Sequence, residues 1–267
     1  MINKSLTLVG LTFFLFSNSA VASEDNSLPP YSKSTISGTQ LRGSFSIRTW
    51  FSDVDAEYEL AGTRILSAKD IRSVATEAHY RLESSGTRFF FQGTAGVGAN
   101  FNGEFDQPYG TNRDLGTIGF GYFNADLGFR ALDFASQSLG AFAGFQFIHD
   151  RFQTPTVNNR HYYRNPVWSL ARVGVTGRGQ FTDKFGWHAE FAYIPLGQID
   201  TASEFEDEKD ASGYQGEVFL TFNPTETWSI GLGARHWDLE GKVERYGTEM
   251  TIDYTRTGAL LEASYKF

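Results

Sequence analysis

The chain has 267 residues, which is enough for one large domain or two small ones. It contains no cysteine, and this excludes disulfides, thiol catalysis and cysteine-ligated zinc. Its formal net charge of −8 gives no reason to expect nucleic-acid binding. The abundance of aromatic residues (25 Phe, 12 Tyr and 5 Trp) together with 28 Gly favours a β architecture with many turns.

The N-terminus has the features of a secretory signal peptide. Lys4 supplies a positive charge, and an apolar segment over 6–16 (LTLVGLTFFLF) follows it. The tripeptide Ala20-Val21-Ala22 then forms a small-x-small cleavage site. Because the apolar segment has only 11 residues, it is too short for a membrane anchor. We therefore predict a signal peptide over 1–22 that is cleaved after Ala22.

Residues 23–40 are predicted to be a flexible periplasmic lead-in, because they are polar and contain the dipeptide Pro29-Pro30. From Leu41 onward, apolar and polar residues alternate with a period of two, and no helical periodicity takes hold. The remaining segment, 41–267, is therefore predicted to be one β domain. It contains about ten segments that are long enough to cross a bilayer as tilted strands. These are 41–52, 70–83, 88–100, 116–131, 138–152, 167–181, 185–198, 213–223, 227–240 and 249–267.

The connections between the predicted strands alternate in length. Short turns are expected near 84–86, 133–137, 182–184 and 223–226, and longer connections at 53–69, 101–115, 153–166, 199–212 and 241–248. Transmembrane barrels alternate tight periplasmic turns with long outer loops in this way. The sequence therefore predicts an all-β fold, a transmembrane antiparallel up-and-down β-barrel. We expect it to be exported through the periplasm to the outer membrane of a Gram-negative cell.

The last strand carries an apolar face that ends at Phe267. We expect this strand to pair with the first one, because an open sheet edge is not viable in lipid. A terminal aromatic residue after an alternating segment resembles the recognition feature of bacterial outer-membrane proteins. This resemblance implies the outer-membrane assembly machinery as a partner. Outer-membrane lipid and lipopolysaccharide are the other expected partners.

Charged side chains of both signs fall on the predicted inward face. Isolated charges in a narrow lumen would be costly, so we expect them to pair. A polar network that plugs a ten-stranded barrel is favoured over a small solute pore. The inward charged set is Arg48, Glu77, Arg81, Asp126, Arg130, Arg172, Arg178, Glu190, Glu217, Arg235 and Glu262.

Four residues are candidates for catalysis. Glu104 and Asp106 alternate at a strand end, and such a carboxylate pair can hold a water molecule. His149 and His161 flank the third long connection. No serine-hydrolase, zinc-protease or phosphate-loop motif occurs, so we predict no cofactor and no metal.

The segment 203–210 (SEFEDEKD) is strongly acidic. Carboxylates can bind a divalent cation, but the segment lacks the ligand spacing of a known site. A solvated acidic loop is therefore the favoured interpretation.

The layout resembles the omptin-like superfamily of ten-stranded outer-membrane barrels. The resemblance lies in 96–107 (GVGANFNGEFDQ), 173–200 (VGVTGRGQFTDKFGWHAEFAYIPLGQID), 213–237 (GYQGEVFLTFNPTETWSIGLGARHW) and the final EASYKF. It implies a barrel with sorted loops in the outer membrane. Omptins are surface proteases that activate water with an Asp pair and an Asp–His pair.

The protease residues carry over only in part. Glu104 and Asp106 lie near the place of the Asp pair, but the first of them is Glu. The second pair would follow Asp200, and TASEFEDEKD over 201–210 contains no His. The sequence therefore favours a non-enzymatic outer-membrane barrel with a structural or surface-interaction role through its long outer loops. The alternatives are an omptin-type surface endopeptidase with an altered catalytic set and a small solute pore. The sequence specifies neither a ligand nor the oligomeric state.

Overall fold

The computed structural model describes residues 34–36, 39–84, 86–106, 113–114, 117–134, 136–150, 152–153, 163–164, 166–201, 206–245 and 248–267. The predicted signal peptide over 1–22 lies outside the described residues, as does most of the predicted lead-in. The described residues include no helix long and apolar enough to cross a membrane.

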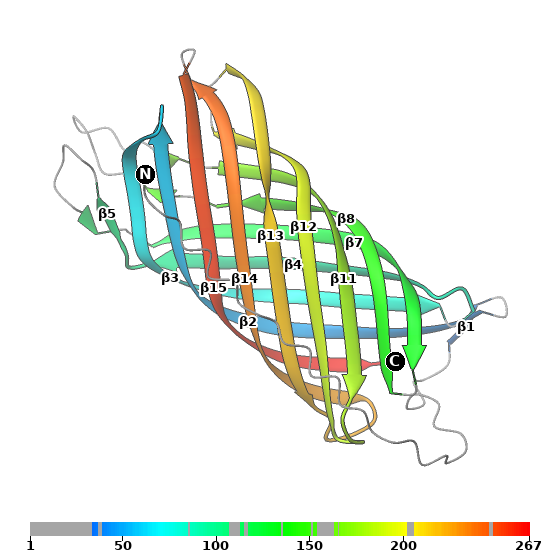
Figure 1. Cartoon of the computed structure of the whole chain (residues 1–267). Helices are drawn as coiled ribbons and strands as arrows, with labels where there is room; N and C mark the ends of the chain where they lie inside the picture. The colour runs from blue at the N-terminus through cyan, green and yellow to red at the C-terminus, as the bar shows by residue number, and fades with distance from the viewer. Residues whose placement is uncertain are drawn as a thin grey trace.

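In the described part of the chain, ten long strands form a closed antiparallel barrel, as the sequence predicts (Figure 1). Strands that follow one another along the chain are hydrogen-bonded neighbours, and β15 pairs with β2 to close the sheet. The long strands are β2 (Thr39–Leu60), β3 (Thr63–Ser84), β4 (Phe89–Phe101), β7 (Ile118–Phe134), β8 (Gln137–His149), β11 (Pro166–Gln180), β12 (Phe185–Thr201), β13 (Glu206–Phe222), β14 (Trp228–Arg245) and β15 (Thr248–Lys266).

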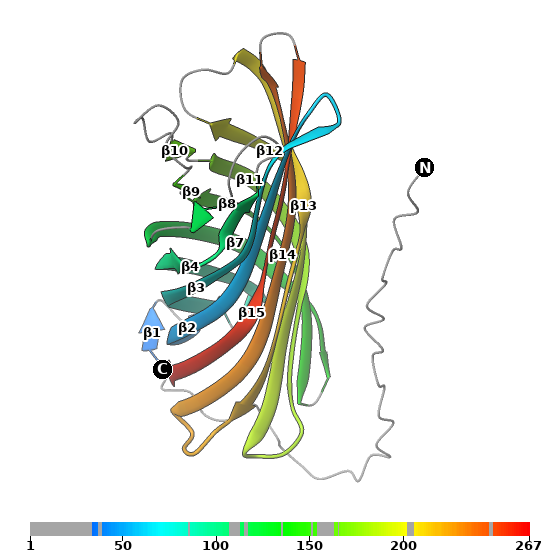
Figure 2. The same cartoon turned by 90° about the vertical axis from the view of Figure 1, so that its left-hand side faces the viewer.

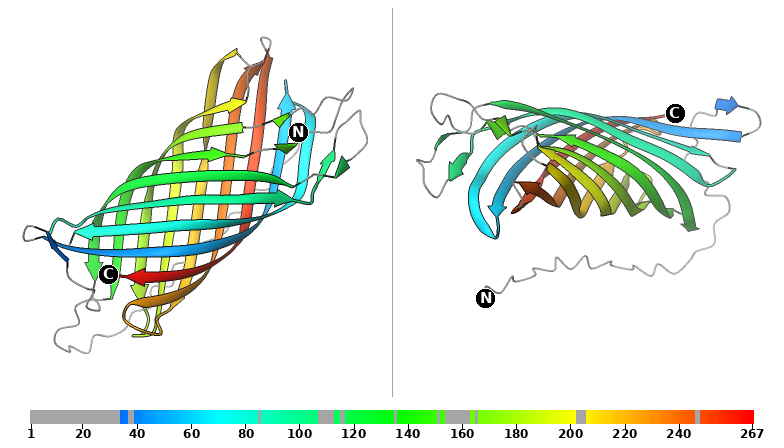
Figure 3. Two further views of the ribbon diagram at one scale, coloured as in Figure 1. Left: turned by 180° about the vertical axis from the view of Figure 1, so that it is seen from behind. Right: turned by 90° about the horizontal axis from the view of Figure 1, so that it is seen from above.

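Short strands accompany the barrel within the same described ranges. They are β1 (Ser34–Ile36), β5 (Glu104–Asp106), β6 (Arg113–Asp114), β9 (Phe152–Gln153) and β10 (Tyr163–Arg164). Because β1 pairs with the start of β2, regular structure begins inside the segment predicted as a lead-in. Strands on opposite walls of the barrel cross steeply, so that β3 and β4 run across β12 and β13 (Figure 3).

The two ends of the barrel differ. Short turns join β3 to β4, β7 to β8, β11 to β12 and β13 to β14 at one end. The start of β2 and the end of β15 lie at this same end, where the backbones of Gly43 and Phe267 exchange two hydrogen bonds of 2.8 and 2.9 Å. We call it the turn end. The opposite end, where β2 turns into β3 and β14 into β15, is the hairpin end (Figure 2).

Three predicted long loops at the hairpin end are mostly strand, and the prediction is wrong there. β2 and β3 are separated by Ala61 and Gly62 alone, where a loop over 53–69 was expected. β14 and β15 likewise extend through most of the expected loop 241–248. The expected loop 199–212 is also largely strand, because β12 ends at Thr201 and β13 begins at Glu206.

These strands continue beyond their predicted ends because apolar and polar residues still alternate there. The two kinds of residue exchange faces, so that the apolar ones now face inward. In β2, the outward side chains are apolar up to Phe51 and acidic from Asp53 onward. The inward side chains change in the opposite sense, from Arg48 to the fully buried Val54. Ala259 of β15 and Ala234 of β14 lie in the same cross-strand row as Phe51, and both strands invert there.

On β2, β14 and β15, this row separates two environments. On its turn-end side, the outward side chains belong to an apolar belt around the barrel, in which Leu232, Leu220 and Leu127 are each more than 60% exposed. A belt of this kind is what lipid requires. On its hairpin-end side, the outward side chains of these three strands are charged or polar and most of the inward ones are apolar, as in a protein surrounded by water. The turn-end half of the barrel therefore has the surface of a membrane-spanning wall, and the hairpin-end half, which projects beyond the apolar belt, has the surface of a protein in water.

Glycine at position 258 is required by close approach at the seam between β15 and β2. A Cβ atom built there would overlap the carbonyl oxygen of Phe51. We therefore expect Gly258→Ala to lower the free energy of unfolding by about 1–3 kcal/mol, the usual cost of overpacking. Urea titration of the refolded protein, followed by the heat-dependent gel shift of folded barrels, measures this change.

Gly119→Ala is the matched control, because a Cβ atom there would meet nothing closer than 3.6 Å. It should leave the urea midpoint nearly unchanged. Equal effects of the two substitutions would contradict the assigned seam geometry.

Candidate functional site

The lumen of the barrel is filled in two different ways. Its hairpin half contains an apolar core in which Trp50, Trp168 and Leu170 are fully buried. Its turn half contains arginine and carboxylate side chains together with a cavity of about 320 Å³. This charged half is the candidate site, because polar groups converge there around an open volume.

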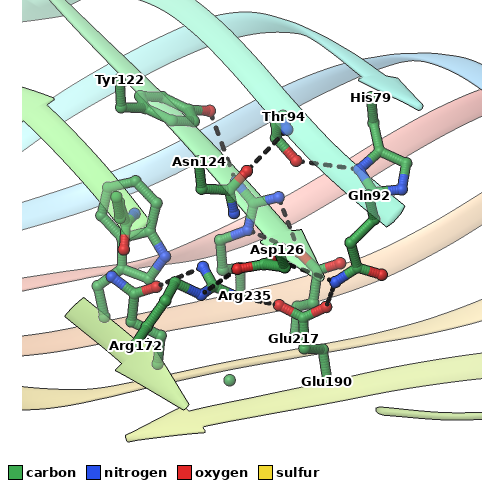
Figure 4. Close-up of a pocket in the computed structure, with 14 residues that line it drawn as sticks. His79, Gln92, Thr94, Tyr122, Asn124, Asp126, Arg172, Glu190, Glu217 and Arg235 are labelled. Carbon is green, nitrogen blue, oxygen red and sulfur yellow. Dashed lines mark hydrogen bonds and ion pairs between the residues drawn. The ribbon is translucent and has the colours of Figure 1, made fainter. Parts of the chain in front are cut away.

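Arg235 of β14 is the centre of the charge network (Figure 4). Its Nη1 atom lies 2.5 Å from Oε1 of Glu77, and its Nη2 atom lies 2.7 Å from Oε2 of Glu217. The hydroxyl group of Tyr122 also donates to Glu77. The guanidinium group packs over the ring of Trp50, with 4.7 Å from Cζ to the ring centroid. Arg235 therefore joins the charged half of the lumen to the apolar core.

A second arginine extends the network towards the seam. Arg48 of β2 donates from Nε to Glu262 at 2.6 Å and from Nη1 to Glu217 at 3.3 Å. Glu217 thus accepts from two arginines that come from different strands. A buried carboxylate shared in this way avoids the desolvation cost of an isolated charge.

A third arginine connects the opposite wall. Arg172 of β11 lies 3.2 Å from Asp126 and also pairs with Glu190. The side-chain amide of Gln92 donates to Glu190 at 2.5 Å and to Asp126 at 3.2 Å (Figure 4). These contacts link β4, β7, β11 and β12 across the lumen.

The cavity opens towards the turn end beyond this network. Glu83 accepts from Nε of Arg81 at 2.5 Å and also pairs with Arg178. Arg130 and Lys266 line the same cavity. The side chain of His79, which also lines it, contacts Thr94 Oγ1 through Nδ1 at 2.9 Å.

A separate polar cluster lies inside the apolar core. Arg256 of β15 and Asp150 are both completely buried and form an ion pair of 2.6 Å. Tyr254 donates to Asp150 at 2.8 Å, and Arg256 also contacts Ser73 at 3.0 Å and Asn100 at 3.2 Å. The cluster satisfies its own charges, as burial requires.

The predicted inward charges occupy the lumen, and their ion pairs confirm the prediction that they pair. Arg256 and Asp150 also face inward but were not among the predicted inward charges. The period of two identifies both, because Arg256 has the parity of Glu262 and Asp150 has that of Gln146. The apolar core was not predicted either, because a polar network was expected in the lumen.

Of the candidate catalytic residues, Glu104 and Asp106 lie on β5, which pairs with β3 beside Lys69 and Ser67. Glu104 is exposed, and Asp106 forms an ion pair of 3.2 Å with Arg64. The two carboxylates therefore lie at the hairpin end on the outside of the apolar core.

His149 is not near this pair. It is the last residue of β8 and has the outward parity of Phe147. The register places His149 opposite Gly121, and Gly121 opposite Val97. Glu104 follows Val97 by seven positions, which corresponds to roughly 20 Å along the strand direction. His161 lies outside the described residues.

In the acidic segment 203–210, residues 203–205 lie outside the described residues. Glu206–Asp210 is part of β13, and of its side chains only that of Asp210 is described. Among the described residues, no group of three His, Asp or Glu side chains is arranged to hold a metal ion. The arginine and carboxylate side chains that line the cavity can form charge-assisted hydrogen bonds to a solute.

The buried ion pair of Arg256 with Asp150 should contribute to the free energy of unfolding. Arg256→Met leaves Asp150 buried without its cation, so we expect a loss of about 3–5 kcal/mol in the free energy of unfolding. The double variant Arg256→Met/Asp150→Asn should recover part of this loss, because both charges are then removed. Urea titrations of the wild type, both single variants and the double variant provide the measurement.

The control is Lys242→Met, which removes an exposed cation whose nearest carboxylate oxygen lies 3.7 Å away. It should change the midpoint little. If the effects of the two single variants simply add in the double variant, the ion pair contributes no coupling and its assigned role is wrong.

A scan against protein-family models finds no match, and no characterised protein matches the chain by sequence. Among solved structures, the outer membrane protease OmpT from Escherichia coli is similar with a TM-score of 0.57. The match has 11% sequence identity and covers 85% of this chain and 96% of that chain. The translocator domain of autotransporter NalP from Neisseria meningitidis gives a TM-score of 0.43 with 11% identity, over 84% of this chain and 88% of that chain. A Pseudomonas aeruginosa FadL homologue gives 0.31 with 8% identity, over 85% and 90%. The likeness to OmpT concerns the fold alone, and the chain has an omptin-like outer-membrane barrel fold.

Proposed function

We propose that the chain is a sealed, non-enzymatic barrel of the bacterial outer membrane that acts through contacts at its hairpin end. The observation that carries this proposal is the apolar filling of the hairpin half of the lumen. Trp50 and Trp168 are fully buried there, and Tyr58 is 1% exposed. A barrel filled in this way presents a rigid body to its surroundings.

The orientation follows from the barrel type. Short turns and chain termini face the periplasm in outer-membrane barrels, and the larger connections face outward. The hairpin end would therefore lie outside the cell, and cleavage after Ala22 would precede assembly. Lipid and lipopolysaccharide would contact the apolar belt, and the outer-membrane assembly machinery would recognise the terminal Phe267.

The structure gives less support to the two alternatives. A solute pore needs a polar path, whereas the hairpin half is packed with buried apolar side chains. An omptin-type peptidase needs a base beside its carboxylates. His149 lies far from Glu104 and Asp106, and Asp106 is paired with Arg64.

The outward surface of the hairpin-end half carries the charges that would select a partner. Its outward side chains on β2, β15 and β14 are strongly acidic. Glu57, Asp253 and Glu240 lie opposite one another in a single cross-strand row. Like charges directly opposite each other destabilise a sheet. The ion pairs of Glu57 with Arg64 and of Glu240 with Lys242 are long, at 3.9 and 4.0 Å, so a cationic partner would add closer pairing there. We call this surface the acidic wall: Asp53, Glu57, Glu59, Asp238, Glu240 and Asp253.

A sealed, non-enzymatic barrel should neither conduct ions nor cut peptides. We expect no current steps from the refolded protein in planar bilayers, and no cleavage of a peptide library rich in Lys and Arg. A wide 16-stranded porin and an active omptin serve as positive controls. Discrete current steps, or cleavage that is lost in Glu104→Gln/Asp106→Asn, would overturn the proposal.

The acidic wall should bind cationic surfaces. We expect Glu57→Gln/Glu240→Gln to weaken binding of a defined-length polylysine probe by about threefold or more at low salt, because rim charges govern electrostatic association. Surface plasmon resonance on the protein in nanodiscs measures the affinity. Added salt should reduce the difference between the variant and the wild type.

The matched control is Asp183→Asn/Glu226→Gln, which removes two exposed carboxylates at the turn end. It carries the same change in net charge but leaves the acidic wall intact. An equal loss of binding in both variants would show that net charge, and not the wall, attracts the probe.

A further inference from the structure

The cavity in the turn half of the lumen has the form of a binding site. Its volume of about 320 Å³ is at the lower end of the range for small-molecule sites. Arg48, Glu190 and Glu217 of the charge network lie on its inner side, and the apolar core lies beyond them. A solute could therefore enter only from the turn end.

The walls of this cavity are rich in neutral hydrogen-bonding groups. Hydroxyl and amide side chains come from most strands of the barrel, and they suit a ligand that carries several hydroxyl groups. They include Ser46, Ser138, Thr176, Thr221, Ser229 and Ser264.

Arg130 is a buried cation with incomplete hydrogen bonding. Arg130 is only 8% exposed, and its Nε atom has no hydrogen-bond partner among the described residues. Its other contacts are long: Nη1 lies 3.7 Å from Asp133, and Nη2 lies 3.4 Å from the carbonyl oxygen of Ser84. A buried donor without an acceptor is costly, so an additional acceptor would stabilise this guanidinium.

Several cationic groups lie near the mouth of the cavity. Lys266 donates to the amide oxygen of Asn223 at 2.7 Å and forms no ion pair with a described carboxylate. Arg81 and Arg178 both pair with the carboxylate of Glu83. Together with Arg130, these groups place four cationic donors at this end of the cavity.

We propose that this cavity binds a small hydroxylated solute that carries a carboxylate or phosphate group. The oxyanion would accept hydrogen bonds from Arg130 and Lys266, and the serine, threonine and amide side chains would bind the hydroxyl groups. The site opens at the turn end, so in the proposed orientation of the barrel its ligand comes from the periplasm. The proposal does not depend on the contacts of the acidic wall.

Isothermal titration of the refolded full chain in detergent tests the site. Gluconate and glucose 6-phosphate are the probes, and glucose and glucosamine provide a similar body without the anion. We expect binding of at least one anionic probe and none of the other two. The anion that binds more tightly identifies the carboxylate or the phosphate as the preferred group. Trp187 lines the cavity, so its fluorescence gives an independent local readout.

Arg130→Gln/Lys266→Gln should weaken anion binding by about tenfold or more, as expected for the loss of charge-assisted hydrogen bonds. Arg130→Lys keeps the charge and should retain more of the affinity than Arg130→Gln. Lys184→Gln/Arg72→Gln is the matched control, because it removes two exposed cations that do not line the cavity.

The heat-dependent gel shift of each variant shows whether the barrel is folded. If the double variant fails to fold, Lys266→Gln alone, on a partly exposed residue, still tests the site. Absence of binding by both anions to folded wild type would overturn the proposal. So would equal affinities of the wild type and the folded cavity variants.

Discussion

Closure of the sheet by β15 and β2 is the constraint on which the rest of the structure depends. The two strands pair from Met250 to Lys266, and the last residue exchanges backbone hydrogen bonds with Gly43. Lipid offers no partner for free backbone groups, so a spanning sheet must close. With ten strands the closed barrel is narrow. Whatever faces inward is confined, and confined groups must pack or pair.

The chain meets this constraint differently on either side of the row at Phe51. On the turn-end side the exterior is apolar, and the interior holds paired charges such as Arg48 and Glu262. On the hairpin-end side the exterior is acidic, and the interior holds Val54 and Tyr58. β2, β14 and β15 are therefore amphipathic along their whole length. A strand that is apolar on both faces would invite aggregation before the barrel closes, and the inversion avoids this.

Much of the fold was predictable because the period of two is strong in every strand. Ten strands, the closure at Phe267 and the inward charges all followed from that period. The hairpin-end extensions were missed because acidic residues such as Asp53 and Glu57 were interpreted as loop residues. The same residues alternate with buried apolar ones, so the inversion is present in the sequence. The cavity could not be predicted, because its volume depends on how side chains from many strands meet, and no local pattern records that.

The charge network separates the two halves of the lumen but also connects them. Glu217 lines the cavity of the turn half and accepts from Arg235. On its other side, the guanidinium group of Arg235 packs over the ring of Trp50, which belongs to the apolar core. A charge placed in the cavity therefore acts on a network whose central arginine contacts the projecting half. Because the core is packed, such a charge acts there through electrostatics and side-chain position.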